Sequence, residues 1–134
     1  MKGSTAALLA TMLLTLAVPA LAHHSFTNFW YMDKTVQITG VVKSLKLVNP
    51  HSEIQVEVTE ASGEKAIWNI TSLGTGSSLF KAGWSKDLLP VGTTVKIDGN
   101  PSRKPGAKAL AAGKITRPDG SVIWFGGGGG VPQG

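Results

Sequence analysis

The stretch that decides the fold runs from residue 53 to residue 71 and reads EIQVEVTEASGEKAIWNIT. Its first part alternates between polar and apolar residues, which places Ile54, Val56 and Val58 on one face of a strand. A second alternating run, residues 65–71, follows a short turn that contains glycine. Two such runs joined by a short turn predict a β-hairpin.

Further strands are predicted on both sides of this hairpin. The run before it, residues 35–48, carries its apolar residues first at even and then at odd positions, which predicts a bulge or sharp bend near Gly40. A Ser cap and a Gly stop predict a short helix at residues 77–83. After this helix, apolar β-prone segments predict strands at 94–99, 109–115 and 122–125.

Three strands, a short helix and at least two more strands follow the order of the OB-fold. The chain is therefore predicted to be all-β, an OB-fold-like five-stranded barrel with one short helix between strands three and four. A β-sandwich is the alternative, but its usual seven or so strands are hard to find here. The side chains expected inside the barrel are Val36, Ile38, Ile54, Val56, Val58, Trp68, Ile70, Val95 and Ile97, with Trp84 also buried.

The chain begins with a segment typical of a secretory signal peptide. Lys2 precedes an apolar run of about 13 residues, shorter than the roughly 20 that a membrane-spanning helix needs. Ala20-Leu21-Ala22 then provides small residues for signal peptidase. We predict a signal peptide at 1–22, an OB-like domain at 23–125, no transmembrane anchor after processing, and a periplasmic or secreted location.

The composition limits the possible functions. The chain has no cysteine, which excludes thiol chemistry and iron–sulfur clusters and leaves stability to the core alone. After loss of Lys2, 12 Lys and Arg oppose 8 Asp and Glu, scattered rather than clustered. This modest positive charge does not indicate a specific nucleic acid partner. The last segment, residues 126–134, begins with five glycines and is expected to be a flexible tail.

The three histidines lie at suggestive positions. Cleavage after Ala22 would make His23 the first residue, followed by His24, while His51 lies in the turn between the first two strands. A terminal histidine offers its α-amine and ring Nδ1 to one metal, and a second imidazole completes a three-nitrogen site that suits Cu(II). We therefore predict a copper site from His23, His24 and His51. The alternative is incidental chelation by an exposed His-His pair.

No set of catalytic residues is evident, so an enzymatic function is the less favoured interpretation. Ser25, His24 and Asp33 are close in sequence, but a triad requires mutual geometry. Three aromatic residues, Phe26, Trp30 and Trp124, are the candidates for exposed stacking against sugars or bases.

Several short motifs occur in one order along the chain. They are His23-His24-Ser25-Phe26, Gly40-Val41-Val42, Asn49-Pro50-His51, Leu79-Phe80-Lys81-Ala82-Gly83-Trp84, Pro90-Val91-Gly92 and Gly99-Asn100-Pro101. This series resembles a family of small exported bacterial proteins of unknown function, whose mature chains begin His-His-Ser-Phe and carry Asn-Pro-His. The resemblance implies a periplasmic OB-like barrel, and it does not assign a reaction to the protein. At residues 69–71 the sequence departs from the family, which commonly has an acidic residue there.

Together these observations favour a non-enzymatic periplasmic protein that binds copper through its terminus and His51. The alternative is a binding or assembly module that uses the barrel face or strand edges to hold a partner protein or a glycan.

Overall fold

The computed structural model describes residues 26–126. The predicted signal peptide, His23, His24 and residues 127–134 lie outside this part of the chain. The elements after a helical turn at residues 26–29 are β1 (Val36–Lys46), β2 (Glu53–Thr59), β3 (Lys65–Ser72), α2 (Gly76–Lys81), the 3-10 helix η1 (Lys86–Leu88), β4 (Thr94–Pro101), β5 (Ala109–Thr116) and β6 (Val122–Trp124). The structure therefore confirms the predicted strands and the short helix between β3 and β4.

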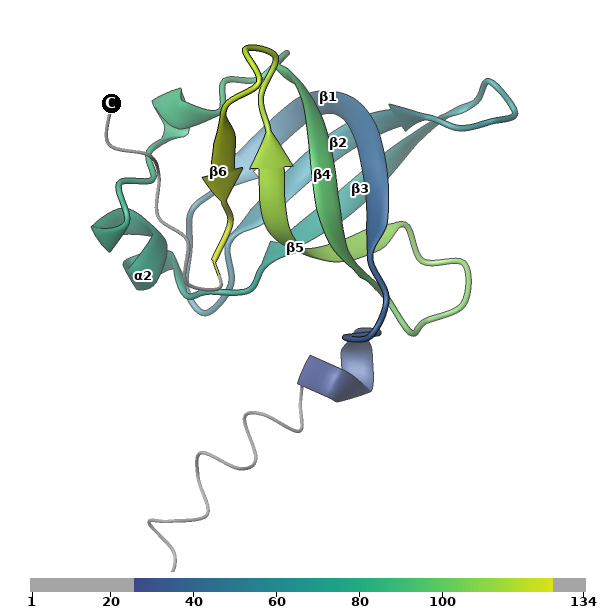
Figure 1. Ribbon diagram of the computed structural model, residues 1–134, viewed down its shortest axis with the longest axis horizontal. Helices are drawn as coiled ribbons and strands as arrows, with labels where there is room; N and C mark the ends of the chain where they lie inside the picture. The colour runs from purple at the N-terminus through teal and green to yellow at the C-terminus, as the bar shows by residue number, and fades with distance from the viewer. Residues whose placement is uncertain (1–25, 127–134) are drawn as a thin grey trace, which may run out of the picture.

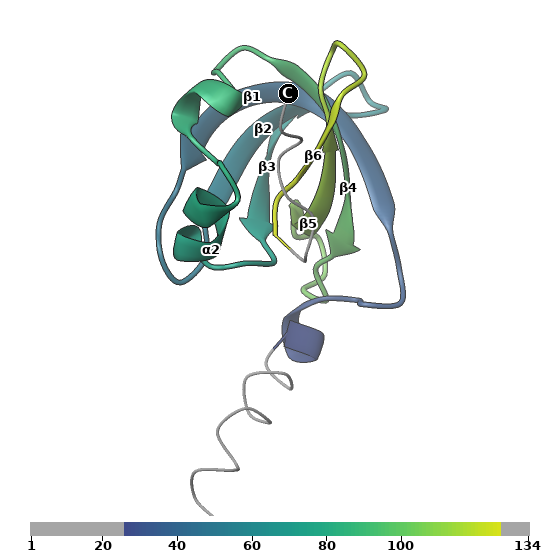
Figure 2. The same ribbon diagram turned by 60° about the vertical axis from the view of Figure 1, so that its left-hand side comes forward.

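One mixed sheet closes into a barrel (Figures 1 and 2). The strand order is β3-β2-β1-β4-β5-β6, and β3 also pairs with β5. This closing pair is parallel and joins residues 69–72 to residues 109–112, whereas all other named pairs are antiparallel. β6 pairs with the other end of β5, at residues 114–116. The five strands β1–β5 and their connection form the predicted OB-fold.

β1 is long enough to pair with a different strand in each half of the barrel, and Figure 1 shows it as a long arch. Its first part, up to Val41, pairs with β4, and the part from Val41 onward pairs with β2. A Cβ added to Gly40 would lie 2.4 Å from the carbonyl oxygen of Glu57, so only glycine allows this approach. The register shift falls between Val42 and Ser44, which accounts for the change of apolar phase along the strand.

The barrel interior contains most of the predicted residues. Those that are buried as predicted are Ile38, Ile54, Val56, Val58, Ile70, Trp84, Val95 and Ile97. The prediction for Val36 is wrong, since it is 36% exposed. It begins β1 and faces Gly99, which has no side chain to cover it. Trp68 is only partly buried against the core.

The segment after β3 closes one side of the barrel. Leu79 of α2 and Leu89 after η1 are buried, and Thr75 caps α2 by accepting a hydrogen bond from the Ser78 amide. The Trp84 ring lies 4.9 Å from the ring of Phe125, and its Nε1 donates to the Trp124 carbonyl. Within residues 26–126, no helix has the length and apolar character needed to cross a bilayer.

Candidate functional site

The β1–β2 loop, residues 47–52, is held by a buried serine pair. The Ser52 amide donates to Ser72 Oγ at 3.0 Å, and the Ser72 amide donates to the Ser52 carbonyl at 2.9 Å. Ser52 Oγ accepts from the Val48 amide at 3.0 Å and donates to the Val48 carbonyl at 3.1 Å. Because both serines are fully buried, this loop is fastened to the end of β3.

The Asn-Pro-His motif lies in the same loop and its residues have different roles. Asn49 Oδ1 accepts from the Ser77 amide at 3.1 Å, which satisfies one of the free amides at the start of α2. A Cβ on Gly76 would meet the Val48 carbonyl at 2.5 Å, so α2 packs closely against the loop. His51, in contrast, is exposed. The fixed loop therefore presents the imidazole to solvent.

The N-terminal segment is attached to the β4–β5 loop, residues 102–108. Arg103 Nε donates to the carbonyls of Thr27 and Trp30, and the Arg103 amide donates to the Phe29 carbonyl. A cation at these carbonyls stabilises the C-terminal end of a helical turn. Asn100 Nδ2 adds a 2.7 Å bond to the Lys34 carbonyl. These contacts fix the turn at residues 26–29 beside the end of β4, at the bottom of the barrel in Figure 1.

This attachment brings the start of the described chain to the loop histidine. The rings of Phe26 and His51 meet edge to face, with centroids 5.8 Å apart. They line a pocket of about 410 Å³, together with Phe29 and Trp30 from the same turn. Three aromatic rings and an imidazole thus come from two segments separated by about twenty residues of sequence.

The polar side of the pocket comes from three residues on two other segments. Thr71 belongs to β3, while Ser102 and Lys104 belong to the β4–β5 loop. Ser102 Oγ accepts from the Lys104 amide at 3.1 Å. In the described part of the chain, the side chains of Thr71, His51 and Lys104 make no hydrogen bond or ion pair. Within residues 26–126, a ligand would therefore displace no side-chain partner of these three groups.

The structure brings some predicted site residues together and leaves others apart. Phe26, Trp30 and His51 share the pocket. Trp124 is 39% exposed on β6 and does not line it. His23 and His24 precede the described residues. Within residues 26–126, no three His, Cys, Asp or Glu side chains lie close enough to hold a metal ion together.

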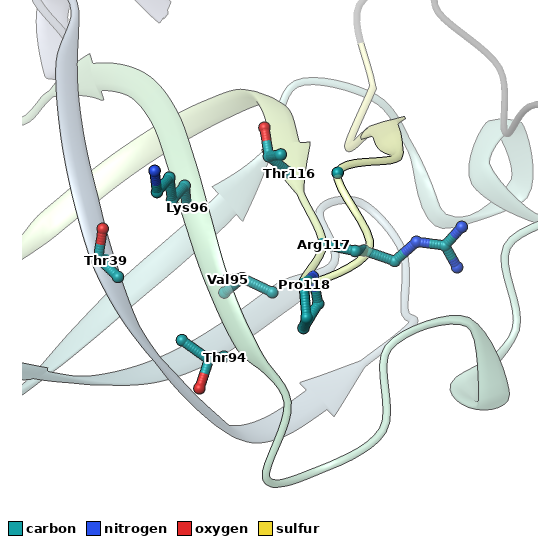
Figure 3. A pocket seen from close by; sticks show the side chains of 8 residues that line it. Thr39, Thr94, Val95, Lys96, Thr116, Arg117 and Pro118 are labelled. Carbon is teal, nitrogen blue, oxygen red and sulfur yellow. The ribbon is translucent and has the colours of Figure 1, made fainter.

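A second pocket, of about 260 Å³, lies on the outer surface of the sheet (Figure 3). It is formed along β1 and β4 and by the turn between β5 and β6, and Lys96 and Arg117 contribute its charge. Figure 3 shows these two side chains pointing in different directions. Arg117 Nε donates to Ser121 Oγ at 2.7 Å. The two cations therefore do not converge on one ligand group.

An ionic cluster fastens the β4–β5 loop to the β2–β3 hairpin. Glu60 Oε1 accepts from Lys108 Nζ at 2.8 Å and from Trp68 Nε1 at 3.0 Å. The hydrogen bond from Lys108, followed by that from Trp68, lowers the pKa of Glu60 below its ordinary value of about 4.5. Lys108 Nζ also lies 5.8 Å from the Trp68 ring centroid. The loop that carries Ser102 and Lys104 is thus held at both ends.

The sequence alone does not identify three residues of the pocket, Thr71, Ser102 and Lys104. They carry no motif, and they are about 20 to 50 residues from His51. The available signal was the topology itself, because the loops between strands one and two and between strands four and five of an OB-fold lie at the same binding region.

The fold and the site define the class as an OB-fold barrel with a pocket at these two loops. The chain belongs to a family of unknown function (DUF6152), whose sequence pattern matches residues 10–111. No curated protein gives a match. Among solved structures, the chain is similar to a mitochondrial single-stranded DNA binding protein from S. cerevisiae, Rim1. The TM-score is 0.48 and the identity 15%, over 63% of this chain and 92% of that one.

Proposed function

We propose that this protein is exported, starts at His23 after cleavage, and binds copper through His23, His24 and His51 without catalysing a reaction. The observation that carries the proposal is the contact between Phe26 and His51. His24 and His23 are only two and three residues before Phe26. At a maximum of about 3.6 Å per residue, two and three residues of chain span at most about 7 and 11 Å.

The ligand chemistry suits Cu(II) better than other divalent ions. A free α-amine and imidazoles form a nitrogen-rich site, and copper has the highest affinity in the divalent series for such ligands. The β1–β2 loop adds preorganisation, because its serine and asparagine bonds fix the backbone that carries His51. A fixed ligand loses less conformational entropy on binding.

The test is a Cu(II) titration of the processed protein by calorimetry, with three comparisons. Replacing His51 by Ala should weaken binding at least tenfold, or about 1.4 kcal/mol. One extra residue before His23 should weaken it as well, because the α-amine is then moved away from the first imidazole. Lys86→Ala, an exposed change on η1, is the matched control and should leave affinity unchanged.

Two results would contradict the proposal. Equal copper affinity in His51→Ala would reduce the site to incidental chelation by the terminus. An intact mass of the exported protein that does not correspond to a start at His23 would remove the chelating amine. Thermal melting of metal-free His51→Ala should match that of the unmodified protein, since within residues 26–126 the His51 side chain makes no hydrogen bond or ion pair that holds its loop.

A second candidate function is a partner-binding module that uses a strand edge. β3 pairs with β5 only from Asn69 to Ser72, so in the described part of the chain residues 65–68 have a strand on one side only. Ile67 in this stretch is 43% exposed. Such an edge can accept an added strand from another protein. Ile67→Lys should abolish this binding and leave copper affinity unchanged.

A further inference from the structure

We propose that the pocket between the N-terminal turn, the β1–β2 loop and the β4–β5 loop binds a small ring-shaped ligand that carries a carboxylate. This goes beyond the proposed copper site, because the ligand is held by side chains that need no metal. The aromatic carboxylates and the acidic sugars share this chemistry. Either could reach an exported protein, and the experiment separates them.

The charge around the pocket favours an anionic ligand. Lys104 lines the pocket, and no Asp or Glu does so among the described residues. The four ion pairs within residues 26–126 all involve other lysines, so the Lys104 ammonium is not neutralised there. A carboxylate placed here meets an unpaired cation without a competing acid, and the positive net charge of the chain adds weak long-range attraction.

Each of the hydrogen-bonding groups at the pocket can donate a proton to a ligand. Thr71 has a hydroxyl without a partner in the described chain, and the Ser102 hydroxyl accepts a bond from the Lys104 amide, which leaves its own proton free to donate. His51 can donate from its ring. A ligand rich in acceptor oxygens satisfies such a set, and charge-assisted hydrogen bonds to a carboxylate are the stronger type.

The opposite side of the pocket selects a ring. Phe26, Phe29 and Trp30 lie on one short turn, and Phe29 is 63% exposed although it is a large apolar residue. Exposed aromatic faces bind flat rings and the apolar faces of sugars by stacking. The volume of about 410 Å³ lies within the range of small-molecule sites and holds one ring with its substituent.

The geometry of the pocket is fixed before the ligand arrives. Arg103 holds the aromatic turn, the pair of Ser52 and Ser72 holds the histidine loop, and Glu60 with Lys108 holds the far end of the loop that carries Lys104. Little ordering is therefore required on binding, which favours affinity in a pocket of modest size.

The experiment uses the processed protein in EDTA, so that copper plays no part, and follows backbone amide NMR shifts. The probes are benzoate, benzyl alcohol, glucuronate and glucose. We expect benzoate, glucuronate or both to bind, with shifts at Thr71, Ser102 and Lys104, and each neutral analogue to bind more weakly than its acid. Which acid binds tighter identifies the source of the natural ligand.

The decisive comparison is between two lysines. Lys104→Gln should weaken binding of the acid by about fivefold, the upper end for an exposed ion pair. Lys96→Gln, in the outer pocket of Figure 3, removes the same charge from the molecule and should have no effect. Phe29→Ala should weaken binding without altering the melting temperature, because that ring is mostly exposed.

Three outcomes would overturn the proposal. Equal losses from Lys104→Gln and Lys96→Gln would show attraction by net charge alone, and equal binding of benzoate and benzyl alcohol would show an apolar pocket only. If no probe shifts the backbone amide signals, the pocket does not bind a ligand of this class. Copper binding is measured separately, so its failure does not affect these results.

Discussion

Ser52→Ala tests whether the β1–β2 loop is preorganised for its histidine. The substitution removes one hydroxyl, and with it the 3.0 Å bond from the Val48 amide and the 3.1 Å bond to the Val48 carbonyl. The bond from the Ser52 amide to Ser72 Oγ and the bond from the Ser72 amide to the Ser52 carbonyl remain. The change is therefore confined to the closure of the loop.

The expected loss of stability follows from these two bonds. A typical intramolecular hydrogen bond contributes about 0.5–1.5 kcal/mol, which gives about 1–3 kcal/mol for two. Val48 is 49% exposed, so water can replace part of what its backbone groups lose. We therefore expect the free energy of unfolding to fall by about 1–2 kcal/mol, at the lower part of that range.

The assay is urea unfolding together with copper titration of the folded protein. Ser52→Ala should weaken copper binding, but by less than the tenfold or so expected for His51→Ala, since the imidazole is still present. In a His51→Ala background it should change copper affinity no further, which is the result that a double-mutant cycle requires for coupled residues. Ser62→Ala is the control, because Ser62 Oγ makes a 3.3 Å bond in an exposed turn.

Two results would refute this reasoning. If Ser52→Ala destabilises the protein without altering copper affinity, the loop bonds support the fold and not the site. If it weakens copper binding equally with and without His51, its effect does not pass through the histidine.

Two further predictions concern the hairpin. Trp68→Ala should lower the free energy of unfolding by about 2 kcal/mol, as measured by urea titration. This is less than the roughly 3–5 kcal/mol expected for a fully buried aromatic residue, because Trp68 is only partly buried. Glu60→Gln should remove a pH dependence. Since the pKa of Glu60 is lowered in the folded state by Lys108 and Trp68, its contribution is present above the ordinary Glu range and is lost as the pH falls through the lowered pKa. The stability difference between the two proteins should shrink below about pH 4.5, and a constant difference would contradict the assignment.

The sequence predicts the strands of this fold well because alternation reports which face is apolar. β2 begins and ends where its pattern does, at Glu53 and Thr59. Alternation does not report where the barrel ends along a strand. Trp68 lies on the inner face opposite Val56, but the closing pair with β5 covers only Asn69–Ser72, so its ring remains partly exposed.

The site was less predictable because its supports join residues far apart in the sequence. The spacing of Asn49-Pro50-His51 predicts a turn, but not that Asn49 binds α2, which lies 28 residues later at Ser77. The same holds for Arg103, whose bonds to the N-terminal turn span more than 70 residues. Such contacts follow from the barrel topology and have no local signal.

The residues of the β1–β2 loop differ in their contacts, and this difference supports a binding role for His51. Its neighbours in the loop meet structural needs: Asn49 binds the first turn of α2, and Ser52 closes the loop on Val48. His51 makes only an edge contact with Phe26 in the described chain. A residue that contributes little to the fold, yet is presented by a fixed loop at the edge of an aromatic pocket, is better explained by what it binds. Copper and a carboxylate bind different forms of a ring nitrogen. The metal binds a nitrogen without a proton, whereas the anion accepts a hydrogen bond from a nitrogen that carries one. The neutral ring has one of each. The same histidine can therefore bind a metal through one nitrogen and donate a hydrogen bond to an anion from the other.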